Sequence, residues 1–444
     1  MSNSPPSSFS LSSLATDAGT ALGARVVGAG LSYVVQILFA RWAGPDHYGA
    51  YSYAMAWAAL LSTLGGLGLP QAIVRYLPEY RRSSRWDYLK GVVRRSEQFV
   101  LAAGCLLAAV GIGTVVVAVP PQSSFRLPLL LGLTLIPLLT LLQLQTEMCV
   151  ARGQVAIAYL LPRLLRPLTM MGGAAVVVLG FDTSLTATIA VLLVGVPVAP
   201  VWLAQRWSFR AHLPAAFHQS TAAYDADHWL RTALPMLLIT GFLLILGKTD
   251  LIMIGILTDA EQVGLYRVAS KISSLVLFPM FAVNAIMAPR FAAQHADQNR
   301  DQLQRLASTA ARWMLAGGLF AAVGLFSASG VLLGLFGSSF IAATPLLYIL
   351  VGGQLANVAA GAVGPLLTMS GHQNEAAKVY GGCALLNVLL NGVGIVLFGP
   401  LGAALATAIS TGLWNVGLYR LVIQTLDVYP SAVDGLRPSR SPSS

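Results

Sequence analysis

The segment GFLLILGKTDLIMIGIL, residues 241–257, decides the fold class of this chain. Leucine, isoleucine and methionine fill most of it, yet Lys248 and Asp250 stand near its middle. A helix crosses the hydrocarbon core of a bilayer in about 20 residues, so an apolar run of this length is typical of a transmembrane helix. A charge at the centre of such a helix costs at least about 2.5 kcal/mol, so these two charges call for a functional or structural reason.

The composition of the whole chain indicates the same solvent. Of its 444 residues, 56% are hydrophobic and 10% are charged, whereas ordinary soluble domains carry roughly 25% charged residues. The formal net charge of +10 would indicate a nucleic-acid partner if it were gathered in one domain. The basic residues are instead scattered over short loops, so we expect no nucleic-acid binding.

Long apolar runs separated by polar breaks predict about twelve transmembrane helices. The predicted fold class is an all-α polytopic membrane protein with about 12 transmembrane helices in two six-helix lobes related by an internal repeat. The predicted spans are 17–43, 49–74, 92–118, 127–151, 156–180, 184–205, 230–257, 262–289, 307–334, 343–370, 375–398 and 401–423.

Changes in composition along the chain predict its domains. Residues 17–206 form the N-lobe with helices 1–6, and residues 230–425 form the C-lobe with helices 7–12. The polar segment 207–229 is predicted as a cytoplasmic inter-lobe linker and as the hinge between the lobes. Residues 1–16 and 426–444, rich in serine and proline, are predicted as disordered tails.

The distribution of basic residues predicts the orientation, because cytoplasmic loops of membrane proteins are rich in lysine and arginine. One set of loops contains only Arg41 and Arg126. The opposite set is therefore cytoplasmic, and an even number of spans places both termini there as well. The cytoplasmic set contains Arg75, Arg81, Arg82, Arg85, Lys90, Arg94, Arg95, Arg152, Arg163, Arg166, Arg206, Arg210, Arg231, Arg290, Arg300, Arg305, Arg312 and Lys378.

An internal repeat relates the two halves. Residues 49–76 align with residues 264–291 without a gap, and each segment is followed by a charged loop and a further helix. Two halves with an even number of spans have the same orientation, and parallel repeats of this kind are typical of transporters that bind substrate between the halves. The matched pairs are Gly49 with Gly264, Tyr51 with Tyr266 and Arg75 with Arg290.

Several motifs resemble a known family. The segment 38–80 contains G-P-x-x-Y-G (Gly44 to Gly49) and G-L-x-x-A-x-x-R-Y (Gly68 to Tyr76). It resembles the start of the polysaccharide-biosynthesis, O-antigen-type flippases of the multidrug/oligosaccharidyl-lipid/polysaccharide exporter superfamily. The segment KTDLIMIGILTDAEQVGLYRVASKI resembles the family's seventh and eighth helices, and 332–350 resembles the linker into its tenth. The resemblance covers about residues 15–425.

The resemblance implies a substrate and its partners. The substrate is a polyprenyl-pyrophosphate-linked oligosaccharide, an O-antigen or exopolysaccharide repeat unit, moved by alternating access from the cytoplasmic to the outer leaflet of a bacterial inner membrane. Membrane lipids, a glycan polymerase and glycosyltransferases are the implied partners, and no cofactor is implied. A cation-coupled small-molecule exporter of the same fold is the alternative. The first helix has only Asp17 at its start and carries Arg25, which weakens that alternative.

Charged residues in the predicted spans give the candidate substrate site. At 1.5 Å per residue, Lys248 and Lys271 lie about 13 Å, Asp250 about 10 Å and Arg267 about 7 Å from the outer ends of helices seven and eight. We expect Asp250 to pair with Arg267 or Lys271, leaving a cationic cavity that Arg25 extends on the other lobe. The alternative is that these side chains snorkel to the surface or hold helices together.

Further polar residues have two interpretations each. Arg163 and Arg166 would dock a lipid headgroup or a pyrophosphate at the cytoplasmic surface, or would simply set the orientation. Gln354, Asn357 and Asn387 would line a sugar path or bond between helices. No metal-binding or nucleophile motif is present, so we predict no catalytic residue, no metal site and no enzyme.

Overall fold

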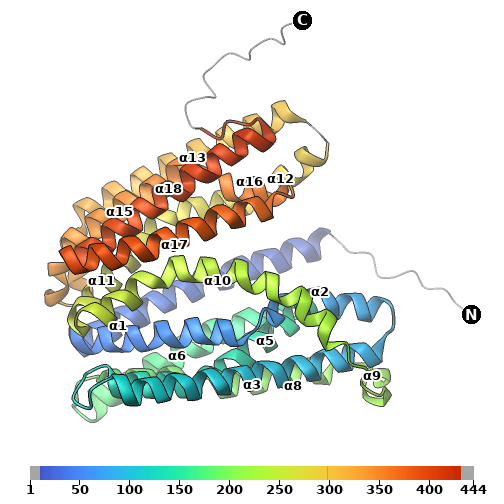
Figure 1. Ribbon diagram of the computed structural model, residues 1–444, viewed down its shortest axis with the longest axis horizontal. Coiled ribbons are helices and arrows are strands. Elements are labelled where there is room, and N and C mark those ends of the chain that lie inside the picture. Colours follow the sequence, from blue (N-terminus) through green and yellow to red (C-terminus); the bar gives the residue numbers. More distant parts are fainter. Residues whose placement is uncertain (1–10, 298, 432–444) are drawn as a thin grey trace, which may run out of the picture. The chain divides into compact units, whose positions relative to one another are not determined.

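The computed structural model describes residues 11–297 and 299–431, and it describes side chains there except at 11–27, 239 and 243. Every regular element in this part of the chain is a helix (Figure 1). Within these described ranges, eight helices are long and apolar enough to cross a membrane, or up to eleven when each bent pair counts as one span. The predicted all-α polytopic class is confirmed, whereas the count of twelve spans is not.

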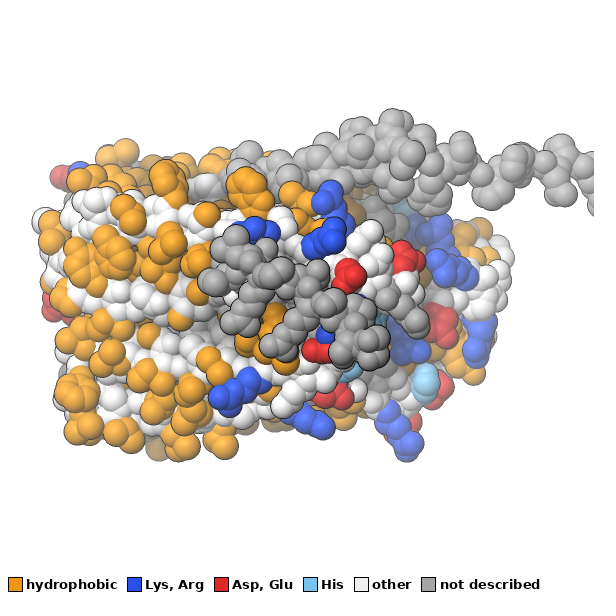
Figure 2. Space-filling model, turned by 90° about the horizontal axis from the view of Figure 1, so that it is seen from above, with side chains coloured by type: hydrophobic (Ala, Val, Ile, Leu, Met, Phe, Trp, Pro, Cys, Tyr) orange, Lys and Arg blue, Asp and Glu red, His pale blue; other side chains and the backbone are white. Residues whose placement is uncertain are grey.

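The outer faces of the helices are apolar, as a lipid environment requires. Val117 on α3 (Trp86–Ala118) is 89% exposed, and Phe320 on α13 (Arg300–Ser327) is 84% exposed. On the face drawn in Figure 2, hydrophobic side chains cover a broad area with very few charges toward the left of the view. The charged side chains gather toward the right of the same face. Side chains this large and this exposed would be costly in water, so these faces indicate contact with lipid.

The chain folds into two compact units that each combine two stretches of sequence. Unit 1 takes the described residues up to Ala43 together with Trp57–Leu238. Unit 2 takes Gly44–Ala56 together with the described residues from Ile239 onward. Each unit therefore receives one helical segment from the other half of the sequence.

Unit 1 is built around the contacts of α2 and α3 with α5. Leu69, Met148 and Trp229 are among the fully buried side chains of its core. Its elements, besides α3 and parts of α1 and α10, are α2 (Leu69–Arg82), α4 (Arg126–Thr134), α5 (Ile136–Ala151), a π-helical turn (Ala156–Leu160), α6 (Leu161–Ala175), a second π-helical turn (Val176–Gly180), α7 (Ala187–Gly195), α8 (Val198–Ala211) and α9 (Ala215–Gln219).

Unit 2 packs its long helices mainly through α18, which contacts both α17 and α15. Its elements, besides α13 and parts of α1 and α10, are α11 (Ala260–Ser273), a 3₁₀ turn (Ser274–Leu277), α12 (Phe278–Ala296), α14 (Ser329–Phe336), a second 3₁₀ turn (Ser338–Ala343), α15 (Thr344–Ala359), α16 (Val363–Met369), α17 (Gln373–Phe398) and α18 (Pro400–Leu426).

Helix α1 (Leu11–Gly65) runs through the first two predicted spans. Its backbone is not helical at Gly44, where φ is 73° and ψ is 172°. Only glycine adopts this conformation readily, and Pro45 then starts a new helical segment with its fixed φ. The sequence G-P thus separates a segment that belongs to unit 1 from one that belongs to unit 2.

The predicted linker 207–229 packs closely onto unit 1. The Nζ of Lys90 donates hydrogen bonds to the carbonyls of His218 at 2.9 Å and Ser220 at 2.6 Å. The indole N–H of Trp229, which is buried, donates to the Tyr80 hydroxyl at 2.9 Å. The two units divide farther along, between Leu238 and Ile239 inside α10 (Ala226–Leu257), which bends by 50° between Phe242 and Leu244.

A reciprocal glycine contact within unit 2 supports the internal repeat. A Cβ on Gly49 would lie 1.7 Å from the carbonyl oxygen of Ala260, and a Cβ on Gly264 would lie 2.1 Å from the carbonyl oxygen of Pro45. The gapless alignment that matches Gly49 with Gly264 also matches Pro45 with Ala260. The two segments therefore cross with local two-fold symmetry, and only glycine permits so close an approach of their backbones.

Candidate functional site

Unit 2 brings together four of the five residues predicted to line a cationic cavity. Lys248 and Asp250 lie on α10, and Arg267 and Lys271 lie on α11. Arg267 and Asp250 are close enough to Lys248 for their charges to interact with it. Lys271 interacts in the same way with Lys248 and with Arg267. We call these four residues the charge cluster; their lining of a substrate cavity stays a prediction.

The carboxylate of Asp250 has a different partner from the one we expected. It is 7% exposed, and its Oδ2 accepts a hydrogen bond of 2.6 Å from the hydroxyl of Tyr266. Its Oδ1 accepts from the N–H of Leu251 at 2.8 Å. Among the described residues Asp250 forms no ion pair, so the expected pairing with Arg267 or Lys271 is wrong.

A buried tyrosine is the better partner for physical reasons. The Tyr266 side chain is 1% exposed, and its hydroxyl also lies 3.4 Å from the Oγ1 of Thr407 on α18. A hydroxyl bonded to a carboxylate forms a short, charge-assisted hydrogen bond. A rigid ring loses less conformational entropy than a long lysine or arginine side chain when it is fixed. The cations of the charge cluster are consequently not neutralised by a direct contact with Asp250.

Arg267 interacts with a residue from the first half of the sequence. Tyr48, which is fully buried in unit 2, lies within hydrogen-bonding reach of the Arg267 side chain. Tyr48 is the tyrosine of the G-P-x-x-Y-G motif, so the motif supplies a neighbour to Arg267 of the charge cluster. The motif draws attention to Tyr48 in the sequence. Hydropathy alone does not show that Tyr48 packs near Arg267.

Buried amides connect the helices of unit 2. Asn387 on α17 donates to the Oγ of Ser410 on α18 at 2.8 Å, and Asn415 donates to the Oδ1 of Asn357 on α15 at 3.0 Å. Of the two interpretations left open, the structure therefore shows bonding between helices for Asn357 and Asn387. The Oδ1 atoms of Asn387 and Asn391 are buried and have no hydrogen-bond partner among the described residues. Such unmet acceptors cost about 1–3 kcal/mol each, so they mark a place where a donor would bind favourably.

The remaining predicted site residues lie in unit 1. Arg163 on α6 has its guanidinium carbon 4.9 Å from the ring centre of Tyr159, and it packs against Gly28 of α1. Arg166 lies on the same helix and is half-buried. Docking of a headgroup or pyrophosphate by these arginines stays a prediction. Arg25 falls outside the residues whose side chains the structure describes.

No metal centre is present in the described part of the chain, where no group of three or more His, Cys, Asp or Glu side chains could hold an ion. The charge cluster contains three cations and one carboxylate that is already hydrogen-bonded. The charge cluster therefore carries an excess of positive charge, and cations in a low-dielectric setting attract phosphate and carboxylate groups strongly.

Comparison with protein families identifies relatives for most of the chain. Residues 14–295 match the family described as polysaccharide biosynthesis protein, and residues 235–393 match the MatE family. The chain is 22% identical over 395 residues to the probable low-salt glycan biosynthesis flippase Agl15 of Haloferax volcanii, covering 87% of this chain and 79% of that protein.

Solved structures show the same fold. An inward-facing multidrug resistance transporter of the MATE family, in the MOP superfamily, superposes with a TM-score of 0.74 at 12% identity, covering 89% of this chain and 95% of that one. The lipid II flippase MurJ in an inward closed conformation gives a TM-score of 0.71 at 15% identity, covering 91% of this chain and 87% of that one. These likenesses confirm the two-lobed fold. Because the family match spans residues 14–295 of 444, well over half of the sequence, the chain belongs to the polysaccharide biosynthesis protein family.

Proposed function

We propose that this protein is a flippase that moves a polyprenyl-pyrophosphate-linked oligosaccharide, such as an O-antigen or exopolysaccharide repeat unit, from the cytoplasmic to the outer leaflet. The observation that carries the proposal is the charge cluster on α10 and α11 of a multi-pass membrane protein in this family. The relatives agree with the expectation that the chain is not an enzyme, since they are two flippases and a transporter.

The charges of the cluster suit a pyrophosphate. The cluster has three positive charges, on Lys248, Arg267 and Lys271, and a single negative charge on Asp250. The Asp250 carboxylate already accepts a hydrogen bond from Tyr266. An excess of positive charge away from water would offset the negative charge of a lipid-linked pyrophosphate during its passage through the bilayer. Sugar groups would then meet polar side chains, whereas the lipid chain would remain in the bilayer.

Transport would follow the alternating-access scheme of two-lobed transporters, in which a central site is exposed to each side of the membrane in turn. The arginine-rich loops favour cytoplasmic termini, and the family resemblance favours a bacterial inner membrane. The partners in this proposal are the lipid-linked oligosaccharide, membrane lipids, and the glycosyltransferases and glycan polymerase that act before and after transport.

A cation-coupled small-molecule exporter is the second candidate. The MatE match over residues 235–393 favours it, and Asp250 supplies a buried protonatable group in this segment. The larger match to the polysaccharide family and the cationic excess of the charge cluster favour the flippase. Export driven by a pH gradient and abolished in Asp250→Asn, without movement of any lipid-linked sugar, would establish the second candidate.

The test is a flipping assay in vesicles. Purified protein is reconstituted with a fluorescent lipid-linked oligosaccharide, and an external quencher reports how much probe reaches the outer leaflet. Lys271→Ala removes one charge-assisted contact of about 1.5–3 kcal/mol, so we expect flipping to slow roughly tenfold or more. Lys271→Arg should restore most of the rate, since it restores the charge.

The matched control is Lys378→Ala, which removes the same charge from an exposed position on α17 of the same unit. It should flip at the wild-type rate. Equal rates for Lys271→Ala and the wild type, at equal folded abundance, would remove the charge cluster from the mechanism. A wild-type protein that moves no lipid-linked sugar would refute the flippase proposal itself.

A further inference from the structure

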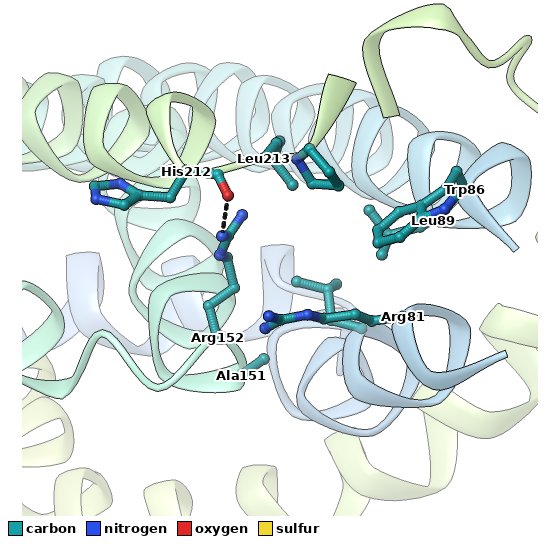
Figure 3. Close-up of a pocket in the computed structure, with 9 residues that line it drawn as sticks. Arg81, Trp86, Leu89, Ala151, Arg152, His212 and Leu213 are labelled. Atoms are coloured by element: carbon teal, nitrogen blue, oxygen red, sulfur yellow. Dashed lines mark hydrogen bonds between the residues drawn. The ribbon is translucent and has the colours of Figure 1, made fainter. Parts of the chain in front are cut away.

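A cavity of about 390 Å³ lies in unit 1, and none of its lining residues belongs to the charge cluster. Its walls come from the end of α2, the start of α3, the end of α5 and the segment that follows α8. Figure 3 shows the lining side chains, among them two arginines and several large apolar residues. The lining includes Leu77, Arg81, Trp86, Leu89, Arg152 and Leu213, and it contains no aspartate or glutamate.

Arg152 is fixed in place without losing its charge to a carboxylate. Its Nη1 donates to the carbonyl of Phe209 at 3.2 Å and its Nη2 donates to the carbonyl of His212. Its guanidinium carbon also lies 5.4 Å from the ring centre of Phe209. The Nε is buried and has no hydrogen-bond partner among the described residues. The side chain is therefore oriented in advance and retains donor capacity.

Arg81 brings a second positive charge to the same cavity. Figure 3 shows its guanidinium directed toward the side chain of Arg152. Burial lowers the pKa of Arg152, and the nearby charge of Arg81 lowers it further. Neither arginine has an ion-pair partner in the described ranges. Two like charges that share a cavity repel each other, and a bound anion relieves that repulsion.

The rest of the lining is suited to an amphiphile. Leu77 and Leu89 are buried, 3% exposed each, and Trp86 adds an indole ring. Arginine distribution assigns this end of unit 1 to the cytoplasmic surface, where anionic headgroups concentrate. Indole rings are typical of this depth, because they combine an apolar surface with an N–H donor.

We propose that this cavity binds the phosphate group of an anionic lipid at the cytoplasmic leaflet. Arg81 and Arg152 contact the phosphate, and the leucines and Trp86 contact the hydrocarbon part of the lipid next to it. The phosphate belongs either to a membrane phospholipid or to a lipid-linked pyrophosphate, since both present the same group at this depth. The inference does not depend on the proposed transport function, and the site is separate from the charge cluster of unit 2.

Thermal unfolding of the full-length protein in neutral detergent tests the site. Dioleoyl phosphatidylglycerol is titrated in, with dioleoyl phosphatidylcholine as the zwitterionic control, undecaprenyl pyrophosphate as the lipid-linked arm and inorganic pyrophosphate as the soluble arm. We expect the anionic lipids to raise the unfolding temperature more than phosphatidylcholine does. Arg81→Gln should weaken the apparent affinity for them roughly tenfold, as the loss of one charge-assisted contact implies.

Two further variants separate the cavity from general surface charge. Leu213→Trp fills the cavity and keeps both arginines, so it should abolish the preference for anionic lipid. Arg82→Gln removes the neighbouring charge, which does not line this cavity, and should behave as the wild type. Arg152 itself is left unchanged, because it also holds the carbonyls after α8.

The arms identify the ligand. A stronger effect of undecaprenyl pyrophosphate than of phosphatidylglycerol assigns the site to lipid-linked substrate, and the reverse assigns it to phospholipid. Stabilisation by inorganic pyrophosphate alone, with the same dependence on Arg81, supports the phosphate contact but overturns the lipid part of the proposal. Equal losses in Arg81→Gln and Arg82→Gln, or unchanged binding in Leu213→Trp, overturn the site.

Discussion

Replacing Tyr266 by phenylalanine tests the buried hydrogen bond to the Asp250 carboxylate in unit 2. The substitution keeps the ring and its packing but removes the hydroxyl that donates to Asp250 at 2.6 Å. Hydrogen bonds to charged groups contribute about 1.5–3 kcal/mol, and the loss falls in the upper part of that range where the acceptor stays buried. Asp250 is 7% exposed and, among the described residues, would keep only the N–H of Leu251 as a donor, so we expect Tyr266→Phe to destabilise unit 2 by about 2 kcal/mol.

A double-mutant cycle isolates the contact. Asp250→Asn replaces the charged acceptor by a neutral one, so the same hydroxyl should then contribute only about 1 kcal/mol. Tyr266→Phe should therefore cost about 1 kcal/mol less in the Asp250→Asn background than in the wild type, a coupling that additive mutations would not show. Thermal unfolding in one detergent, followed by tryptophan fluorescence, measures all four proteins.

Tyr380→Phe is the matched control. Tyr380 lies in unit 2, its ring packs against Trp414, and its hydroxyl makes no hydrogen bond to any described residue. This control should unfold within about 1 °C of the wild type, whereas Tyr266→Phe should unfold at least about 4 °C lower. Equal unfolding temperatures for the two variants would refute the view that the hydroxyl stabilises a buried charge.

Two other substitutions, each with a control, test the packing of unit 2 and of unit 1 in turn. Gly264→Ala should reduce stability by about 3 kcal/mol, because its new methyl group would lie 2.1 Å from the carbonyl oxygen of Pro45. The control is Gly412→Ala, whose methyl group would meet no neighbouring atom within 4 Å and which should be neutral or stabilising. Similar unfolding temperatures for the two variants would contradict the close crossing of the two segments. Trp229→Phe should reduce stability by about 1–3 kcal/mol, because it leaves the buried Tyr80 hydroxyl without its donor. The control Trp207→Phe, at an exposed position, should cost almost nothing. Protease cleavage within residues 212–225 in Trp229→Phe alone would verify that Trp229 holds this segment to unit 1.

The fold class was predictable because a bilayer imposes a simple rule on a sequence. Backbone groups in lipid have to bond internally, so apolar runs of sufficient length are helices. The sequence also showed that Gly49 and Gly264 occupy equivalent positions of the internal repeat. Their reciprocal close approach explains why both positions are glycine. Hydropathy does not report which helices pack together, so the division of the chain inside α10 was not predictable.

The candidate site was predictable in its charges but not in its contacts. Lys248 and Asp250 stand out because charges are rare in apolar helices. The partner of Asp250 does not stand out, because Tyr266 adjoins Arg267 and either side chain would satisfy a carboxylate. The cavity in unit 1 lined by Arg81 and Arg152 could not be predicted, because these two arginines lie far apart in the sequence and each resembles the other arginines of the loops predicted to be cytoplasmic.

The exchange of segments between the units restricts where the molecule can move. Gly44–Ala56 belongs to unit 2, although the rest of the first half belongs to unit 1, and the start of α10 belongs to unit 1, although its end belongs to unit 2. Any movement of one unit against the other is therefore absorbed where the chain passes between them. One of these passages coincides with a break in the helix, at Gly44, and the passage between Leu238 and Ile239 lies a few residues before the bend between Phe242 and Leu244. The segment 207–229, which its polar composition made the obvious hinge, is held to unit 1 by Lys90 and Trp229 and would move with it as one body.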